Sequence, residues 1–398
     1  MAANEKDIIK AFLEGTNILD KTLSSYHCEP GVFEDFVLAY CGGYCVTVPM
    51  KKDNDQKLSK CLRIWTRNIP DIKERSMLVS RALKKSQLSY FVDYEYLDQA
   101  LKLADRTEPG IRMDWLDEPT ITLQNFLFMG PTLLQLKKLA YNFYHMCLDM
   151  NKFGFAHGDL SSSNILVKPD ISLSLIDYDS MYVPEMAGRG FKQQITGTDG
   201  FQHRSRHNRI IKANQKNDYF SQQIIYIQLL AFTIQPQLCK QIDDKALLFN
   251  KKDLESIRNF KSSPYYKILF AMKNADITFY LGELEKAINE DDLDKVKSLC
   301  DLTPPSMSHQ SEMPKPVDNK YRKENLGTLN TQPRVSEGPK KVNRIYKIEI
   351  PKSSASSAGK KGERCAFCNS IIANGYSDAN YCSYCGAPRL MYKITGKV

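Results

Sequence analysis

The chain has 398 residues, of which 42% are hydrophobic and 25% are charged, with 55 Lys and Arg against 46 Asp and Glu. This length and apolar content allow two or three folding units and exclude a wholly disordered protein. Residues 1–302 carry 39 basic and 39 acidic residues, residues 303–362 carry 12 and 5, and residues 363–398 carry 4 and 2. Because the excess positive charge is confined to the C-terminal quarter, a generic nucleic-acid-binding surface on the larger part is disfavoured.

The apolar stretches and the cysteines bear on the cellular compartment. No apolar run approaches the ~18–20 residues of a membrane helix, and the N-terminus has no apolar core of a signal peptide. Seven of the 11 cysteines are scattered without a pairing rhythm, whereas four are grouped near the C-terminus. Such usage is typical of reduced thiols together with a metal site, so we expect a cytoplasmic protein with no membrane partner.

The first 118 residues predict a small, sheet-rich lobe. Apolar residues at helical spacing between residues 6 and 22 indicate an amphipathic helix within an N-terminal helical extension of residues 1–27. Three strand-like runs, FEDFVLAY, CVTVPM and LSKCLRIW, then follow between about residue 33 and residue 67. A helical segment, IKERSMLVSRALKKS, is followed by further strand-like runs, YFVDYEYL and GIRMDWLD.

Residues 119–302 predict a larger, helical lobe. Four stretches have helical patterns: LLQLKKLAYNFYHMCLDMNK, YFSQQIIYIQLLAFTI, LESIRNF and ITFYLGELEKAI. Two short strand-like pieces, ILVKP and LSLIDYD, interrupt them. We therefore expect an α+β fold with two unequal lobes.

The segment FAHGDLSSSNILVKPDISLSLIDYDSMYVP carries the candidate chemistry. His157, Asp159 and Asn164 form an HxDxxxxN pattern, and Asp177 ends the second strand-like piece thirteen residues after Asn164. Phosphoryl transfer needs a carboxylate at the attacking hydroxyl, and an Asn and Asp pair that holds magnesium against the phosphates. The spacing of these four residues provides such parts.

This pattern resembles the protein kinase-like superfamily, in which HxDxxxxN is followed by a D-F-G motif on the next hairpin. The short motifs HGDL, IDYDxMYVP and GFxH are similar to those of a bacterial branch of serine/threonine kinase-like proteins. The resemblance implies a bilobal kinase-like fold for residues 28–302, with Asp159 as catalytic base and His157 as the structural histidine of the loop. It also implies that Asn164 and Asp177 are magnesium ligands.

Later segments extend the resemblance toward protein substrates. Gly197, Thr198 and Phe201 match the end of a kinase activation segment, which in the family holds the substrate backbone. Asp218 matches a buried aspartate that accepts hydrogen bonds from the backbone of the catalytic loop. Small-molecule phosphotransferases of the aminoglycoside type usually lack both features. The resemblance therefore favours a Ser or Thr hydroxyl on a protein as the acceptor.

The small lobe matches the family less closely. Gly42 and Gly43 form the candidate phosphate loop, although GxGxxG is absent and a plain hairpin turn is the alternative. Arg63 takes the place of the family's strand lysine and would bind the phosphates as a planar fork. Glu74, eleven residues later, is either the acid that pairs with Arg63 or an acid at the start of a helix.

Three further positions have open alternatives. The backbone between Met113 and Leu116 would bind adenine, unless Met113 and Trp115 are plain core residues. Asp179, in place of the family's glycine, could reach a second metal or pair with a nearby arginine. The basic run from His203 to Lys216 could hold a phosphorylated residue or an acidic substrate, or it could be a solvated charged face.

The C-terminal part predicts a tether and a metal module. Residues 303–362 are rich in Pro, Ser, Gly and Lys, a composition typical of a flexible linker, here a basic one. Residues 363–390 contain two CxxC pairs separated by thirteen residues, the pattern of a structural zinc ribbon used for docking or regulation. The four predicted zinc ligands are Cys365, Cys368, Cys382 and Cys385.

Together these features predict ATP- and magnesium-dependent phosphoryl transfer to Ser or Thr hydroxyls of a protein substrate. Two alternatives remain open: a catalytically weak or inactive pseudokinase scaffold, and a nucleotidyl transferase on the kinase fold. Any contact with nucleic acid is expected only through the basic linker and the zinc ribbon.

Overall fold

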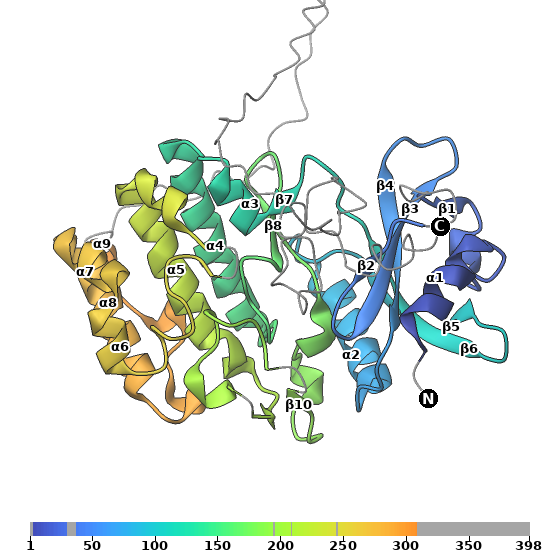
Figure 1. The fold of residues 1–398 in the computed structure, drawn as a ribbon. Helices are drawn as coiled ribbons and strands as arrows, with labels where there is room; N and C mark the ends of the chain where they lie inside the picture. Colours follow the sequence, from blue (N-terminus) through green and yellow to red (C-terminus); the bar gives the residue numbers. More distant parts are fainter. Residues whose placement is uncertain (1–2, 30–36, 194–195, 208, 244–245, 309–398) are drawn as a thin grey trace, which may run out of the picture.

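The computed structural model describes residues 3–29, 37–193, 196–207, 209–243 and 246–308. The expected basic linker and zinc ribbon, with Cys365, Cys368, Cys382 and Cys385, lie outside these described residues, apart from the first few positions of the linker. Figure 1 shows a mixed α+β fold, in which an antiparallel sheet meets a mostly helical part. We call these two parts the sheet region, up to residue 114, and the helical region, from residue 121 onwards.

The sheet region is built on six antiparallel strands. Their order is β1-β3-β4-β6-β5, and β2 also pairs with β3. The strands are β1 (Tyr26–Cys28), β2 (Tyr40–Cys41), β3 (Cys45–Lys52), β4 (Leu58–Trp65), β5 (Tyr94–Lys102) and β6 (Thr107–Asp114). Each strand-like run predicted from residue 45 onwards in this region overlaps one of them.

Two helices cover the two faces of this sheet. Helix α1 (Glu5–Leu13) packs Phe12 against one face, and helix α2 (Ile72–Ser86) packs Val79 against the other. Helix α2 begins and ends at the predicted residues. Helix α1 is shorter than the helix expected to extend to residue 22, because the chain turns at Gly15, whose φ of +40° is incompatible with a continuing helix.

Strand β4 brings a charged side chain into the protein interior. Because side chains alternate along a strand, Leu62 and Ile64 pack on the side of α1, whereas Cys61 and Trp65 pack on the side of α2. Arg63 shares the face of Cys61 and Trp65 and is only 7% exposed. The position of β4 between β3 and β6 thus buries this guanidinium.

The helical region is organised around two long helices, α4 and α5, which match their predicted ranges to within one residue. Its helices are α3 (Leu123–Phe128), α4 (Leu133–Phe153), α5 (Tyr219–Ile234), α6 (Ile257–Ser262), α7 (Pro264–Ala271), α8 (Ala275–Asn289) and α9 (Pro305–Ser308). Its strands are β7 (Ile121–Thr122), β8 (Ile165–Val167), β9 (Leu173–Leu175), β10 (Lys192–Gln193) and β11 (Ile211–Lys212). Among the described residues, no helix has both the length and the apolar character needed to cross a bilayer.

A small antiparallel sheet, β7-β8-β9, positions the motif residues. The HGDLSSSN segment leads into β8, and the turn that carries Asp177 follows β9. The two ends of this hairpin meet, because the backbone N–H of Ile176 donates to the carbonyl oxygen of Asn164 at 3.1 Å. This hydrogen bond holds Asn164 close to Asp177, which follows Ile176 directly and lies thirteen positions after Asn164 in the sequence.

The packing of the central strands yields a stability prediction. A Cβ added to Gly110 on β6 would lie 2.7 Å from the Arg63 carbonyl oxygen and 2.7 Å from the Ile64 side chain. We expect Gly110→Ala to lower the free energy of unfolding by roughly 1–3 kcal/mol, measured by chemical denaturation. Gly282→Ala on α8 is the control, because open space surrounds that position and the helix gains ~0.5–1 kcal/mol. A Gly110→Ala variant as stable as the parent would contradict this packing.

Candidate functional site

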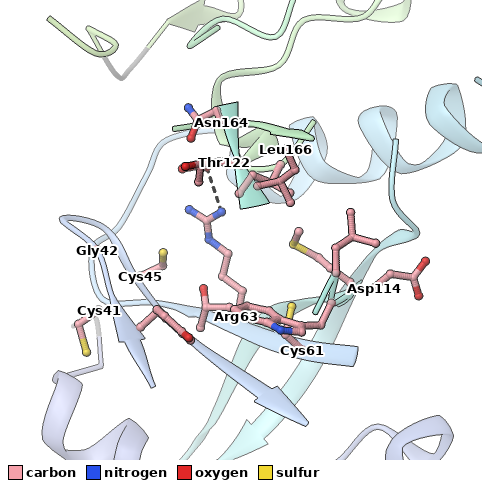
Figure 2. A pocket seen from close by; sticks show the side chains of 16 residues that line it. Cys41, Gly42, Cys45, Cys61, Arg63, Asp114, Thr122, Asn164 and Leu166 are labelled. Carbon is pink, nitrogen blue, oxygen red and sulfur yellow. Dashed lines mark hydrogen bonds and ion pairs between the residues drawn. The ribbon is translucent and has the colours of Figure 1, made fainter. Parts of the chain in front are cut away.

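A cavity of about 460 Å³ lies between the sheet region and the helical region. Figure 2 shows the Arg63 side chain extending from the sheet across this cavity toward Asn164 and Thr122. The cavity brings together six of the residues that the sequence predicts to bind nucleotide or magnesium: Gly42, Arg63, Met113, Leu116, Asn164 and Asp177.

The two glycines of the candidate phosphate loop have different places. Strands β2 and β3 form a tight hairpin, in which the N–H of Gly42 donates to the carbonyl oxygen of Cys45 at 2.8 Å. Gly42 lines the cavity, whereas Gly43 lies in the turn and is not among the described lining residues. The segment is therefore the hairpin turn that the sequence left as an alternative, and one of its glycines lines the cavity.

The expected pairing of Glu74 with Arg63 is wrong in this structure. Glu74 lies in the first turn of α2, its side chain is 56% exposed, and it pairs with Arg189 at 2.9 Å. Arg63 instead points from β4 into the interior. Among the described residues, Glu74 is therefore an exposed helix-start acid and does not line the cavity.

Arg63 bridges two carboxylates of the turn after β9. Its Nη1 donates to Oδ1 of Asp177 at 2.9 Å, and its Nη2 donates to Oδ2 of Asp179 at 2.7 Å. The Asp177 side chain is 42% exposed and lines the cavity, whereas the Asp179 side chain is 1% exposed. Of the two roles open to Asp179 from the sequence, the structure shows the ion pair with an arginine. Sequence reasoning missed that this arginine is Arg63.

The shared guanidinium separates the acidities of the two carboxyls. Burial alone would raise the pKa of Asp177, but the charge of Arg63 and its hydrogen bond hold this pKa below the ordinary value of 3.8. Burial raises the pKa of Asp179 to about 6; the Arg63 charge opposes the rise and the Asp177 charge adds to it. Asp177 is thus the stronger acid of the pair.

The backbone of the HGDLSSSN loop is held by a buried aspartate. Asp218, at the start of α5, accepts hydrogen bonds from the N–H of His157 and, at 2.8 Å, from the N–H of Gly158. This confirms the place that the resemblance implied for Asp218. The His157 ring accepts from the N–H of Asp159 through Nδ1 at 3.3 Å and meets the Ile176 carbonyl oxygen through Nε2 at 2.8 Å. His157 therefore joins the loop to the turn after β9.

Asp159 is not among the described residues that line the cavity; it lies in the adjoining loop, five residues before the lining residue Asn164, and faces the segment that contains Thr198. It accepts the Thr198 N–H at 2.7 Å and the Thr198 hydroxyl at 3.2 Å. Burial raises the pKa of Asp159 above 3.8, although the hydrogen bonds from Thr198 oppose the rise. A carboxylate with a raised pKa is a better proton acceptor. Asn164 is tied to the same loop, since its Nδ2 donates to the Asp159 carbonyl oxygen at 2.8 Å.

The donor atoms at the cavity suit a hard cation. Asp177 offers carboxylate oxygens and Asn164 offers an amide oxygen, and magnesium is bound in proteins through such oxygen ligands. Asp177 has φ +69° and ψ +70°, a left-handed conformation that is uncommon outside glycine and marks constrained backbone. Among the described residues, no group of three or more His, Cys, Asp or Glu is arranged as a metal site.

Sequence reasoning missed Tyr40, which forms an aromatic pair at the cavity with Trp115 of the candidate adenine-binding segment. Tyr40 and Trp115 both line the cavity, with ring centroids 5.2 Å apart. The position of Tyr40, two residues before Gly42, was the available signal. Together with Met113 and Leu116, these rings give one part of the cavity an apolar and aromatic surface.

The two halves of the basic run after the Thr198 segment differ. His203 Nε2 contacts the Ala287 carbonyl oxygen at 3.0 Å, and Arg204 Nε donates to the Ile288 carbonyl oxygen at 3.1 Å, so these two side chains tie the segment to α8. Arg206 is buried at 1% exposure. The later members, Arg209, Lys212 and Lys216, are exposed, as expected of a solvated charged face.

Comparisons with known proteins do not assign a function to this chain. No family model matches the chain, and no curated protein is significantly similar to it. The function is therefore argued from the cavity and the adjoining loop.

The raised pKa of Asp179 predicts a pH-dependent stability. Its folded pKa of about 6 lies above its ordinary value of 3.8, so the folded protein binds more protons than the unfolded chain between these pH values. Ionisation of Asp179 then costs stability as the pH rises through this window. We expect the unfolding free energy of the parent to fall by roughly 2–3 kcal/mol relative to Asp179→Asn between about pH 4 and pH 7, measured by denaturation at each pH. A difference that is constant or grows in the other direction would contradict the assignment.

Proposed function

We propose that this protein is an ATP- and magnesium-dependent phosphotransferase with a bilobal kinase-like fold, and that it transfers phosphate to Ser or Thr hydroxyls of a protein. One observation carries the proposal. A single cavity joins Gly42, Arg63, Asn164 and Asp177 with the segment after β6, although these residues are far apart in the sequence. Phosphoryl transfer requires parts of this kind, and their order along the chain resembles that of the protein kinase-like superfamily.

The cavity offers separate surfaces for a base and for phosphates. The backbone after β6, near Met113 and Leu116, and the Tyr40 and Trp115 rings would hold the purine, since planar bases stack well on aromatic faces. Arg63 is the cation that lines this cavity, and a planar guanidinium suits phosphate oxygens. The β2–β3 hairpin at Gly42 would cover the phosphates from the sheet side.

Asn164 and Asp177 are the residues that would hold magnesium. Asp177 is ionised at neutral pH because its pKa is lowered, and its carboxylate is accessible from the cavity. When bound, magnesium would neutralise charge on the phosphates. The left-handed backbone at Asp177 and the hydrogen bond between Ile176 and Asn164 keep the two ligands at one end of the β8–β9 hairpin.

Asp159 is the proposed catalytic base. In the proposed reaction the acceptor oxygen bonds to the γ-phosphorus, the bond from that phosphorus to the bridging oxygen breaks, and Asp159 takes the hydroxyl proton. The raised pKa of Asp159 suits this role. Asp218 and His157 position the loop and do not touch the reacting atoms.

A protein acceptor is favoured by the segment around Thr198. The backbone N–H of Thr198 donates a hydrogen bond to Asp159. Phe201, three residues later, is buried, and its carbonyl oxygen accepts a hydrogen bond from the Ser221 hydroxyl at 2.8 Å. The segment is thus anchored both to the proposed base and to α5, so it could present a peptide backbone at the reacting hydroxyl. A zinc ribbon at Cys365–Cys385 and a cytoplasmic location complete the proposal and rest on the sequence alone.

Asp159→Asn separates chemistry from binding. We expect this variant to lose at least ~100-fold in phosphate transfer, because the hydroxyl proton has no acceptor, while it binds a non-hydrolysable ATP analogue with magnesium as the parent does. Transfer is measured with γ-labelled ATP and binding by titration calorimetry. Asp177→Asn should lose both transfer and the magnesium-dependent part of binding.

The matched control is Asp149→Asn, an aspartate on α4 that accepts the Tyr90 hydroxyl at 2.9 Å and lies outside the HGDLSSSN loop. Its transfer rate should stay within about twofold of the parent, as expected for a site away from the reacting atoms. Full transfer by Asp159→Asn would rule out the assigned base.

A further inference from the structure

Arg63 is a buried cation whose two partners differ in what they can reach. Its side chain is 9% exposed, and so it needs a counter-ion within the protein. Asp177 faces the cavity, whereas Asp179 is enclosed on the other side of the guanidinium and is not among the described lining residues. Only Asp177 is therefore placed to meet a ligand that enters the cavity.

Helix α2 supplies no carboxylate that neutralises Arg63. Glu74 is the only carboxylate within Ile72–Ser86, and it is engaged by Arg189 at the surface. The charged residue that α2 does bury is Arg75, which is 2% exposed. Its Nη1 donates to the Met181 carbonyl oxygen at 3.0 Å and its Nη2 to the Lys192 carbonyl oxygen at 2.6 Å. Helix α2 thus holds the backbone that follows Asp179, and leaves the pairing of Arg63 to that turn.

The two partners come into conflict when a cation is bound. A carboxylate that ligates magnesium cannot at the same time fully neutralise a buried guanidinium at 2.9 Å. If Asp177 were the sole protein partner of Arg63, magnesium binding would require the nucleotide phosphates alone to compensate the buried guanidinium. The 2.7 Å pair with Asp179 removes that requirement.

We propose that Asp179 is a positioning residue for Arg63: it holds the guanidinium at the cavity wall and so leaves Asp177 available to magnesium. Asp179 is thus the acid that pairs with Arg63, which was one of the two roles that the sequence left open for Glu74. The inference rests on the proposed nucleotide site, and it concerns a residue that touches neither nucleotide nor metal.

The test measures how strongly magnesium improves nucleotide binding. Titration calorimetry gives the dissociation constant of a non-hydrolysable ATP analogue in excess EDTA and in saturating magnesium, and the ratio of the two constants is compared between variants. In Asp179→Asn we expect this ratio to fall ~10-fold or more, because magnesium must now compete with Arg63 for Asp177. Glu74→Gln removes the same charge from α2 and should leave the ratio unchanged. An unchanged ratio in Asp179→Asn, or a fall in Glu74→Gln, overturns the proposal.

A second measurement tests the pair without any ligand. We expect Arg63→Met to lower the melting temperature by several degrees more in the parent than in the Asp179→Asn background, because the two charges are coupled. If Asp179→Asn alone fails to fold, the double variant should recover folding. Equal effects of Arg63→Met in both backgrounds, or no such recovery, would show that the pair is not coupled. Failure of the parent to bind nucleotide would instead refute the proposed function, while this cycle would still report on the pair.

Discussion

The burial of one guanidinium is the constraint on which the rest of the site depends. Strand alternation directs Arg63 of β4 inward, where a charge must find partners inside the protein. Both partners come from the turn after β9, so the ion pairs with Asp177 and Asp179 join the sheet region to the helical region at the cavity. The geometry of the cavity is thus set by an electrostatic contact and not by apolar packing alone.

On the helical side of the cavity, hydrogen bonds to a buried carboxylate hold the HGDLSSSN loop in place. The loop that carries Asp159 has few apolar side chains to pack, and its backbone is instead fixed by the buried carboxylate of Asp218. His157 links the same loop to the turn after β9, and Thr198 bonds to Asp159 itself. Hydrogen bonds that involve Asp218, His157 and Thr198 thus connect the loop to α5, to the turn after β9 and to the Thr198 segment.

Local patterns were enough to predict much of the fold and the placement of the HGDLSSSN loop before a short hairpin. Helices α2 and α5 begin and end at the predicted residues, because apolar periodicity and flanking polar residues are local signals. The spacing from Asp159 to Asp177 was informative because a short hairpin brings its ends together. The partner of Arg63 could not be predicted, since it depends on which face of α2 is buried and on a left-handed turn at Asp177. The early end of α1 reflects one glycine within an apolar pattern that continued beyond it.

The most direct test of the central claim uses ATP labelled separately at the γ and α phosphates. Purified full-length protein is incubated with magnesium, each label, and an added mixture of proteins, and label on protein is then measured. We expect γ label on Ser or Thr hydroxyls, none from the α position, and no γ label when Asp159 is replaced by Asn. Label from the α position would indicate nucleotidyl transfer. Absence of both labels despite nucleotide binding would indicate a scaffold, and either result would contradict the assignment as a phosphotransferase.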